Sequence, residues 1–582
     1  MIPAFCAEWK KSYAPWRLPW SDMAMCVMPI SLHALNMSFS RAAPSSSEYW
    51  VWTCRCVNGG FDTVAASKAN SSRHDPDQIP TACGQSGGQR RSLCLGTDTR
   101  PASPRTFIRS RRALPRTSVR CRGGEAPPPM SCTTCTRRHP AMSVPQLNDE
   151  QRGDEILTVF DTAFGELLAA DPAAFRVKFR KMAASAFAFY RGTACLFYHD
   201  LDPEKRGGPY LDERTSRVWI HGDLHAENFG TYMDANGRLI FNVNDFDEAY
   251  VGPFTWDLKR FAASIALIGY AKALGDEQIS ELVRIYAAAY RERVHALATG
   301  AKSDEVPPFT LDTAQGPLLD ALRDARAVTR FGLLDSMTEI RDFERRFAPD
   351  GGSIELDAAT RYKVLAAFDG YLETLPDASL ARPDSYRVKD VVGRRGIGIG
   401  SAGLPSYNIL LEGHTDALEN DVVIYIKQAQ TPAVSRHITD QALRDYFQHE
   451  GHRTVISQRA LQANADPWLG WTELDGAGQL VAEVSPYAVD LDWGDIDDPE
   501  EIEAVVADLG RATATMHAAA DDTSGESLVP FSTERAIDAA IAGDEEGFAE
   551  LLVDFAHGYG ARARADHQIF VDLFRNGRIP GL

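Results

Sequence analysis

Cysteine is scarce in most of this 582-residue chain. Nine of its ten cysteines lie within residues 1–141, and only Cys195 lies beyond them. A disulfide framework is therefore excluded for residues 142–582, and such a chain is typical of a reducing compartment. We expect a cytoplasmic protein.

Long apolar segments are also few. Residues 23–40 carry no formal charge, but Pro29, His33, Asn36 and several serines interrupt them. A membrane-spanning helix needs about 20 predominantly apolar residues, and a secretory signal needs a compact apolar core before a small-residue cleavage site. The sequence therefore predicts neither a membrane span nor export.

Acidic residues are few in the first part of the chain and abundant afterwards. Residues 1–141 contain 19 Lys and Arg against 8 Asp and Glu, a net charge of +11, which leaves 42 basic and 72 acidic residues, a net charge of −30, for the remainder. The first part shows no sustained helical or strand period, and residues 97–106 and 122–129 have too few apolar side chains to offset chain entropy. We expect residues 1–141 to be a disordered or spurious extension.

Three interpretations of this extension stay open. The first is that it is translated upstream sequence and that the protein starts at Met142. The second is a basic nucleic-acid-binding arm at residues 109–122, and the third is a metal site at Cys132 and Cys135. A single cysteine pair is weak support for a metal site. We favour the first interpretation and expect no nucleic-acid partner.

From Glu155 onward the pattern is that of a folded protein. Apolar side chains recur at helical spacing at Ile156, Val159, Phe160, Phe164 and Leu167. Further along, short alternating runs at residues 217–220 and 238–244 predict strands, and the Asp-Ala-Asn-Gly stretch at 234–237 predicts a turn.

Two polar motifs follow these predicted strands. Residues 221–228 read His-Gly-Asp-Leu-His-Ala-Glu-Asn, and residues 244–248 read Asn-Asp-Phe-Asp-Glu. Either motif alone would be commonplace, but the two together at this spacing are fairly specific. They predict carboxylates and an amide on loops at strand ends.

These side chains suit phosphoryl transfer. Asp223 can accept or orient the proton of a substrate hydroxyl, and Asn228 and Asp245 can bind one magnesium ion together with substrate phosphates. Asp247 is a second metal ligand or a turn cap.

Several motif residues also have structural interpretations. Asp223 and Asn228 could satisfy loop backbone groups. His221 and His225 could be metal ligands, but we expect them to brace the loop. Arg191 lies in an apolar stretch and needs a partner, for which we favour an ion pair over a phosphate contact.

The two motifs resemble the catalytic and metal-binding loops of aminoglycoside phosphotransferases, choline kinases and, more distantly, protein kinases. Asp257 resembles the aspartate that these families place after the metal loop to brace the catalytic loop. Over residues 180–480 the chain also resembles the uncharacterised bacterial family called domain of unknown function 2252, which supplies no activity. That resemblance includes both motifs and the Trp-Asp-Leu-Lys-Arg stretch at residues 256–260.

The kinase resemblance implies a nucleotide-binding lobe, but no glycine-rich loop followed by a strand-borne lysine precedes the motifs in the folded region. Residues 396–403 read Gly-Ile-Gly-Ile-Gly-Ser-Ala-Gly, and predicted strands at 407–412 and 421–427 follow. Lys427 ends the second strand and could neutralise phosphates as a catalytic lysine. The residues predicted to contact the nucleotide are Gly398, Gly400, Ser401, Gly403 and Lys427.

The implied fold is α+β, with a two-lobed, kinase-like core that is circularly permuted because the catalytic loop precedes the nucleotide lobe. We expect a helical lobe with both loops at residues 142–380, a glycine-rich β lobe at 381–480 and C-terminal helices at 481–582 that complete the catalytic lobe. Within the last segment, residues 502–518 resemble the helix that normally leads into a catalytic loop.

A kinase-like lysine also needs a carboxylate that holds it. A helix bearing Glu450 could supply this carboxylate to Lys427, although Asp440 or Asp445 could reach the lysine equally well. A solvated role would also explain all three carboxylates.

The expected activity is phosphoryl transfer from ATP or GTP with Mg²⁺ to a small-molecule hydroxyl acceptor. The acidic body favours a cationic or neutral acceptor, and the sequence does not indicate an oligomeric state. Three rivals stay open: a metal-dependent phosphoesterase, which should show further metal-ligand loops, a kinase-like module that binds without turnover, and a nucleotidyl transferase.

Overall fold

The computed structural model describes residues 49–54, 63–68, 148–201, 208–300, 308–349, 352–394, 404–519 and 528–582. Contacts divide the chain into two units, Met1–Pro129 and Met130–Leu582. In the first unit, β1 (Tyr49–Cys54) and β2 (Thr63–Lys68) form an antiparallel pair. The rest of residues 1–141, including Cys132, Cys135 and residues 109–122, lies outside the described residues, so the interpretations of this extension stay predictions.

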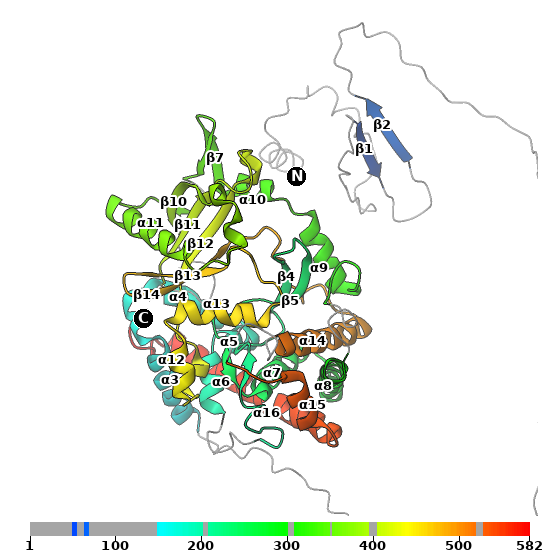
Figure 1. Cartoon of the computed structure of the whole chain (residues 1–582). Helices are drawn as coiled ribbons and strands as arrows, with labels where there is room; N and C mark the ends of the chain where they lie inside the picture. The colour runs from blue at the N-terminus through cyan, green and yellow to red at the C-terminus, as the bar shows by residue number, and fades with distance from the viewer. Residues whose placement is uncertain are drawn as a thin grey trace, which may run out of the picture. The chain divides into compact units, whose positions relative to one another are not determined.

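The second unit contains a six-stranded antiparallel sheet in the order β13-β14-β12-β11-β10-β9, which Figure 1 shows on one side of a group of helices. Its strands are β9 (Ser353–Ile354), β10 (Val388–Arg394), β11 (Ser406–Leu411), β12 (Val422–Gln428), β13 (Gly470–Leu474) and β14 (Ala477–Glu483). The strands predicted at residues 407–412 and 421–427 are confirmed with small shifts at their ends. The α+β class is confirmed as well.

Helices pack on this sheet and connect its strands. Apolar side chains of α11 (Ala358–Leu372), such as Phe368, share a core with Ile409 and Ile424 of the sheet. Between β12 and β13 lie α12 (Gln441–Tyr446) and α13 (Glu450–Leu461). A hairpin of β7 (Thr338–Arg341) and β8 (Glu344–Phe347) follows α10 (Arg330–Met337).

The largest apolar core lies among the helices of the other side. These are α7 (Phe254–Ala271), α8 (Asp276–Ala298), α9 (Gly316–Ala327), α14 (Pro499–Ala519), α15 (Thr533–Ile541) and α16 (Glu545–Arg575). The helix predicted at residues 502–518 is confirmed as part of α14. No helix among the described residues combines the length and the apolar character that crossing a membrane requires.

Two strand pairs present the polar motifs. β3 (Val218–Ile220) pairs with β6 (Tyr250–Gly252), and β4 (Phe229–Met233) pairs with β5 (Leu239–Val243). The predicted turn at residues 234–237 joins β4 to β5, and Gly237 has the positive φ of 74° that a tight turn requires. The motif at residues 221–228 therefore links β3 to β4, and the motif at 244–248 links β5 to β6.

The N-terminal helices of the unit pack against its last helix. They are α3 (Asp149–Ala170), α4 (Pro172–Met182), α5 (Ala186–Arg191) and α6 (Ala194–Asp200). Asn148 and Gln151 form a capping box that begins α3, and the helical spacing predicted from Ile156 onward is confirmed. Phe160 and Phe179 pack against Phe570 of α16.

A buried ionic network ties α3, α6 and α16 together. Arg152 donates bidentate hydrogen bonds to Asp200, at 3.0 and 2.7 Å, and to Asp566, at 2.9 and 2.7 Å. Tyr559 also donates to Asp200, at 3.0 Å. Removing one partner from a buried network leaves uncompensated charge, which costs more than the intact pair contributes.

We expect Arg152→Met to lower the free energy of unfolding by about 3–5 kcal/mol, because the carboxylates of Asp200 and Asp566 lose their main partner inside the protein. Arg323→Met is the control, since the Arg323–Asp320 pair is exposed and contributes less than about 1 kcal/mol. Chemical denaturation measures both changes. Similar small effects would contradict a structural role for the network.

Candidate active site

The loop at residues 221–228 is anchored by a buried carboxylate. Asp257, in the first turn of α7, accepts hydrogen bonds from the backbone N–H groups of His221 at 2.6 Å and Gly222 at 2.9 Å. His517 of α14 lies 3.2 Å from the same carboxylate and is held from its other side by the hydroxyl of Tyr290 at 2.9 Å. Side chains of α7 and α14 thus fix the start of the loop.

Gly222 is required at this point of the loop. Its φ is 80°, and a Cβ added there would lie 2.1 Å from the backbone oxygen of Glu248. The left-handed conformation and the close approach both favour glycine. The two motif loops consequently touch each other through their backbones.

Asp223 is held by a guanidinium group. The Nε and Nη2 atoms of Arg260 lie 2.6 and 2.5 Å from its Oδ1, and Nη2 also donates to the Tyr190 carbonyl at 3.0 Å. Burial raises the pKa of Asp223, although Arg260 and His221 oppose that shift. The side chain is 17% exposed, so one carboxylate edge is accessible while Oδ1 is fixed.

The two histidines lie around Asp223 in different environments. His221 Nε2 lies 2.7 Å from the Asn244 carbonyl, and its Nδ1 accepts from the Asp223 backbone N–H at 3.3 Å. These contacts fit a neutral ring with its proton on Nε2. His225 Nε2 lies 4.0 Å from Asp223 Oδ2, and burial lowers the pKa of His225 well below its usual range.

Asn228 joins the two loops. Its side-chain amide donates to the Asp223 carbonyl at 2.9 Å, and its backbone carbonyl accepts from Asn244 at 3.1 Å. The amide oxygen is the end of this side chain that can ligate a cation. Asn228 therefore lies beside Asp245, which follows Asn244.

Asp245 is exposed and has an unusual backbone. Its φ is 59°, in the left-handed region. Crowding by surrounding protein atoms and the negative charge of Asp247 raise the pKa of Asp245 to about 6, although Lys427 opposes them. The two neighbouring carboxylates repel each other, and a bound cation would reduce that repulsion.

Lys427 comes from the sheet and reaches the second motif. Its Nζ lies 2.5 Å from Asp247 Oδ2, and both side chains are 18% exposed. The pKa of Lys427 is raised by Asp247 and Asp245 against the effect of burial, and the ammonium group in turn lowers the pKa of Asp247 against burial. Lys427 also lies opposite Ser406 in the register of β12 and β11.

The carboxylates considered as partners of Lys427 contact arginine or glutamine side chains instead, so that expectation was wrong. Glu450 accepts from Arg453 at 2.9 Å, one turn along the same helix. Asp440 pairs with Arg217, and Asp445 accepts from Gln441 at 2.7 Å. Two of the three carboxylates, those of Glu450 and Asp445, thus contact a side chain of their own helix.

Two further side chains, those of Glu248 and Arg453, connect the sheet side with the second motif and Ala249, the residue after it. Glu248 accepts from the Ala433 backbone N–H at 2.6 Å, and burial and the nearby Asp223 charge raise the pKa of Glu248 to about 7. Arg453 donates to the carbonyls of Ala249 at 2.9 Å and Gln430 at 2.8 Å.

Sequence reasoning missed Arg260 and Arg453, although each carried a usable signal. Both are charged residues on largely buried helices, α7 and α13, and such charges need partners. The same reasoning did identify Arg191, which pairs with Glu227 of the first motif.

The glycine-rich segment is placed only by its flanks. Gly398, Gly400, Ser401 and Gly403 lie outside the described residues. β10 ends at Arg394 before them, β11 begins at Ser406 after them, and the two strands are antiparallel neighbours. The segment therefore joins β10 to β11.

No group of three or more His, Cys, Asp and Glu side chains suited to a metal ion occurs in the described part of the chain. Asn228 and Asp245 nevertheless fit magnesium, which is commonly bound by one or two protein oxygens together with substrate phosphates and water. The exposed carboxylate of Asp245 fits such a shared site.

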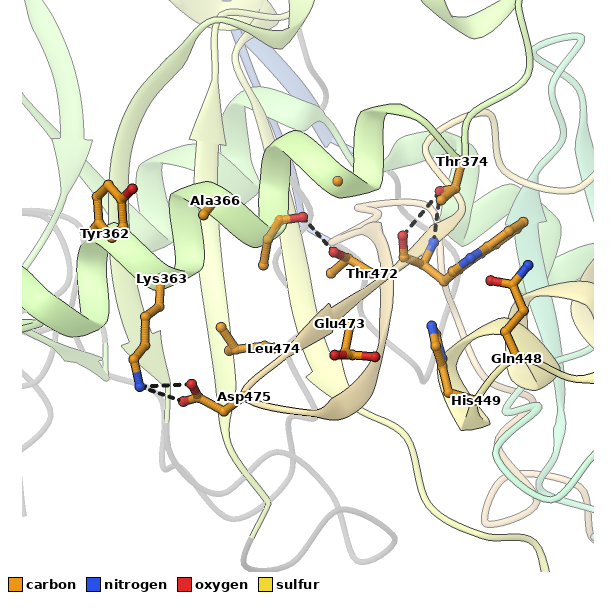
Figure 2. A pocket seen from close by; sticks show the side chains of 13 residues that line it. Tyr362, Lys363, Ala366, Thr374, Gln448, His449, Thr472, Glu473, Leu474 and Asp475 are labelled. Atoms are coloured by element: carbon orange, nitrogen blue, oxygen red, sulfur yellow. Dashed lines mark hydrogen bonds and ion pairs between the residues drawn. The ribbon is translucent and has the colours of Figure 1, made fainter.

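A pocket in the described part of the chain lies away from these loops. It has a volume of about 620 Å³ and is formed by α11, β13 and the residues before α13. Figure 2 shows Lys363 paired with Asp475 at one end and Thr374 bonded to the strand at the other. None of the predicted site residues lines it.

A family model described as "Uncharacterized protein conserved in bacteria (DUF2252)" matches residues 170–573. No curated protein and no solved structure gives a significant match. The match spans both motifs, the sheet and α14.

We expect Gly222→Ala to destabilise the protein by about 1–3 kcal/mol more than Gly237→Ala. Both glycines have a positive φ, which costs a residue with a Cβ about 1–2 kcal/mol, but space around Gly237 is open whereas Gly222 abuts Glu248. Chemical denaturation of the two variants measures the difference. Equal losses would mean that the two loops do not touch at this point.

Proposed function

We propose that this chain, which belongs to the family of uncharacterized proteins conserved in bacteria called domain of unknown function 2252, is a Mg²⁺-dependent phosphotransferase. It would transfer the terminal phosphoryl group of ATP or GTP to a hydroxyl group of a small molecule. The contact between Lys427 and Asp247 carries the proposal, because it joins β12, the second strand after the glycine-rich segment, to the second motif loop.

The order of elements on the sheet side supports a nucleotide site. In protein kinases a glycine-rich loop covers the phosphates and the phosphate-binding lysine lies on the third strand. Here the glycine-rich segment joins β10 to β11, and Lys427 lies on β12, the third strand counted from β10. In this proposal Gly398, Gly400, Ser401 and Gly403 approach the phosphates.

The motif loops supply what the other half of such a site needs. Asn228 and Asp245 would hold magnesium, which supplies charge neutralisation at the transferred phosphoryl group. Asp247 pairs with Lys427. Once nucleotide phosphates bind Lys427 in its place, Asp247 would be free to ligate a second cation.

Asp223 would orient the acceptor hydroxyl. Because Arg260 occupies Oδ1, Oδ2 is the atom available to the acceptor. Arg260 is fully buried and stacks on Tyr190 at 4.3 Å, so the carboxylate has one preferred orientation. Orientation of this kind lowers the barrier without requiring complete proton transfer in the transition state.

A circularly permuted kinase-like arrangement is supported by α14. Although this helix comes last among the elements around the site, its His517 contacts Asp257 and so reaches the anchored start of the first loop. In an unpermuted chain, a helix like α14 would lead directly into β3. His517, Asp257 and the first loop would then lie together as they do here.

The acceptor is proposed to be a cationic or neutral small molecule of the cytoplasm. The net charge of −30 over residues 142–582 disfavours polyanionic acceptors such as nucleic acids.

A second candidate is a module that binds nucleotide without turnover. The pairing of Glu450 with Arg453 favours it, because catalysis in protein kinases requires the strand lysine to pair with a helix carboxylate. Binding and turnover must therefore be measured separately.

We expect Mg²⁺ with ATP or GTP to stabilise the full-length protein by about 2.7 kcal/mol at a nucleotide concentration 100 times the dissociation constant. Thermal unfolding measures this stabilisation, which Lys427→Ala and Asp245→Ala should each remove. Lys363→Ala is the matched control, since Lys363 also lies on the sheet side but pairs with exposed Asp475. No stabilisation by any nucleotide would reject both candidates.

We expect Asp245→Ala to lower the rate of phosphate release from ATP at least as much as Asp223→Ala does. Loss of a group that accepts or orients a proton, such as Asp223, typically lowers the rate by a factor of about 10²–10⁴. Metal positioning and charge stabilisation contribute more to phosphoryl transfer than proton abstraction does. Turnover assays of the two variants test this order. Equal turnover in wild type and Asp245→Ala would rule out the metal assignment, and nucleotide binding without any turnover would favour the second candidate.

A further inference from the structure

The two faces of the six-stranded sheet pack against different helices at β11 and β12. Ile409 and Ile424 share an apolar core with α11. Leu410 and Val423 lie on the opposite face and share a core with Leu334 of α10. Side chains alternate between the two faces along a strand, and residues directly opposite each other on neighbouring strands share a face. We call the second of these faces the α10 face.

The next two pairs of side chains on the α10 face are polar. Asn408 lies opposite Tyr425, and Ser406 lies opposite Lys427. Because side chains on one face of a strand are about 7 Å apart, Asn408 and Tyr425 lie between the apolar core at α10 and the pair of Ser406 and Lys427. Lys427 contacts Asp247, so this end of the α10 face lies beside the second motif loop.

Two polar atoms of these pairs lack a partner. In the described part of the chain, the Asn408 Oδ1 and Ser406 Oγ atoms are buried and have no hydrogen-bond partner. Asn408 is 1% exposed and Ser406 is 9% exposed. A buried polar atom without a partner costs free energy and is uncommon in folded proteins. The orphaned oxygen of Asn408 is therefore suited to a donor that a ligand supplies.

The chemistry around Asn408 fits one kind of ligand group. An asparagine side chain has an acceptor oxygen and an N–H donor, and it pairs with adenine by accepting from the N6 amino group and donating to N7. Tyr425 is partly exposed beside it and offers an aromatic ring on which a base can stack. The phosphates of the same nucleotide would extend along the α10 face toward Ser406 and Lys427.

We propose that Asn408 and Tyr425 bind the adenine base of the phosphoryl donor, so that the donor is ATP rather than GTP. This inference rests on the proposed function, because Lys427 determines where the phosphates lie. The corresponding edge of guanine presents two acceptors, O6 and N7. Guanine in the same position would leave the Asn408 oxygen without a donor and would place O6 against it.

Isothermal titration calorimetry of the full-length protein with Mg²⁺ tests this inference on ATP, GTP and purine riboside triphosphate, which lacks the amino group of adenine. We expect the wild type to bind ATP more tightly than either of the others by a factor of about 5–150. Asn408→Leu replaces the amide with an apolar group of similar shape. This variant should bind ATP and purine riboside triphosphate with equal affinity.

Thermal unfolding without nucleotide gives a second readout, which a purely structural asparagine would change in the opposite direction. Because Asn408→Leu removes an amide whose oxygen has no partner, it should raise the unfolding midpoint of the free protein. Gln479→Met is the matched control. The Gln479 Oε1 atom is also buried without a partner, but Gln479 lies opposite Gln428, on the face away from Lys427, so this variant should keep the preference for ATP.

The outcomes separate this inference from the function on which it rests. Equal affinities of the wild type for ATP and GTP, or a preference for ATP that Asn408→Leu retains, would overturn the inference and leave the proposed function standing. A lower unfolding midpoint in Asn408→Leu would overturn it as well, because the amide would then have a partner inside the protein. Binding of no nucleotide would reject both.

Discussion

The buried carboxylate of Asp257 holds together three parts of the chain that are far apart in sequence. It accepts from the backbone of residues 221 and 222, it belongs to the first turn of α7, and it meets His517 of α14. A charged group in this position is stable only while its donors are present. The first motif loop, and with it Asp223 and Asn228, therefore depends on contacts with side chains of α7 and α14 as well as on its own sequence.

A second set of contacts joins the sheet side to the second motif loop. These contacts are the Lys427–Asp247 pair, the Glu248–Ala433 hydrogen bond and the Arg453–Ala249 hydrogen bond, which connect residues after β11 with the second motif or with the residue that follows it. In the proposed enzyme, nucleotide phosphates would compete with Asp247 for Lys427. Nucleotide binding would therefore weaken the contact between the sheet side and the second motif loop. The family to which the chain belongs is described as uncharacterized proteins conserved in bacteria, and these contacts suggest a specific chemical hypothesis for this chain.

Much of the local structure could be predicted because it depends on near neighbours. The Asp-Ala-Asn-Gly turn and the strands β3, β5, β11 and β12 follow from periodicity and turn chemistry, whereas the helix at residues 502–518 was expected from the kinase resemblance. The partner of Lys427 could not be predicted in this way. Glu450 lies on the next long helix, but its orientation depends on Arg453, one turn away, and on where α13 packs.

The partner of Asp223 illustrates the same limit. Arg260 lies 37 positions later on α7, and only tertiary packing brings it to the loop. Its charge on a buried helix was a visible signal, and the search for a partner that identified Arg191 would have identified Arg260 as well. The turn between β7 and β8 was not predictable either, since its two residues, Asp342 and Phe343, are a poor turn sequence.

Labelling with an acyl-phosphate derivative of ATP, followed by mapping of the modified lysines, tests the central claim most directly. The reagent acylates lysine side chains that lie beside bound phosphates. The account predicts modification of Lys427 that requires Mg²⁺ and is suppressed by excess ATP or GTP. Modification confined to other lysines, or modification of Lys427 that nucleotide does not suppress, would contradict it.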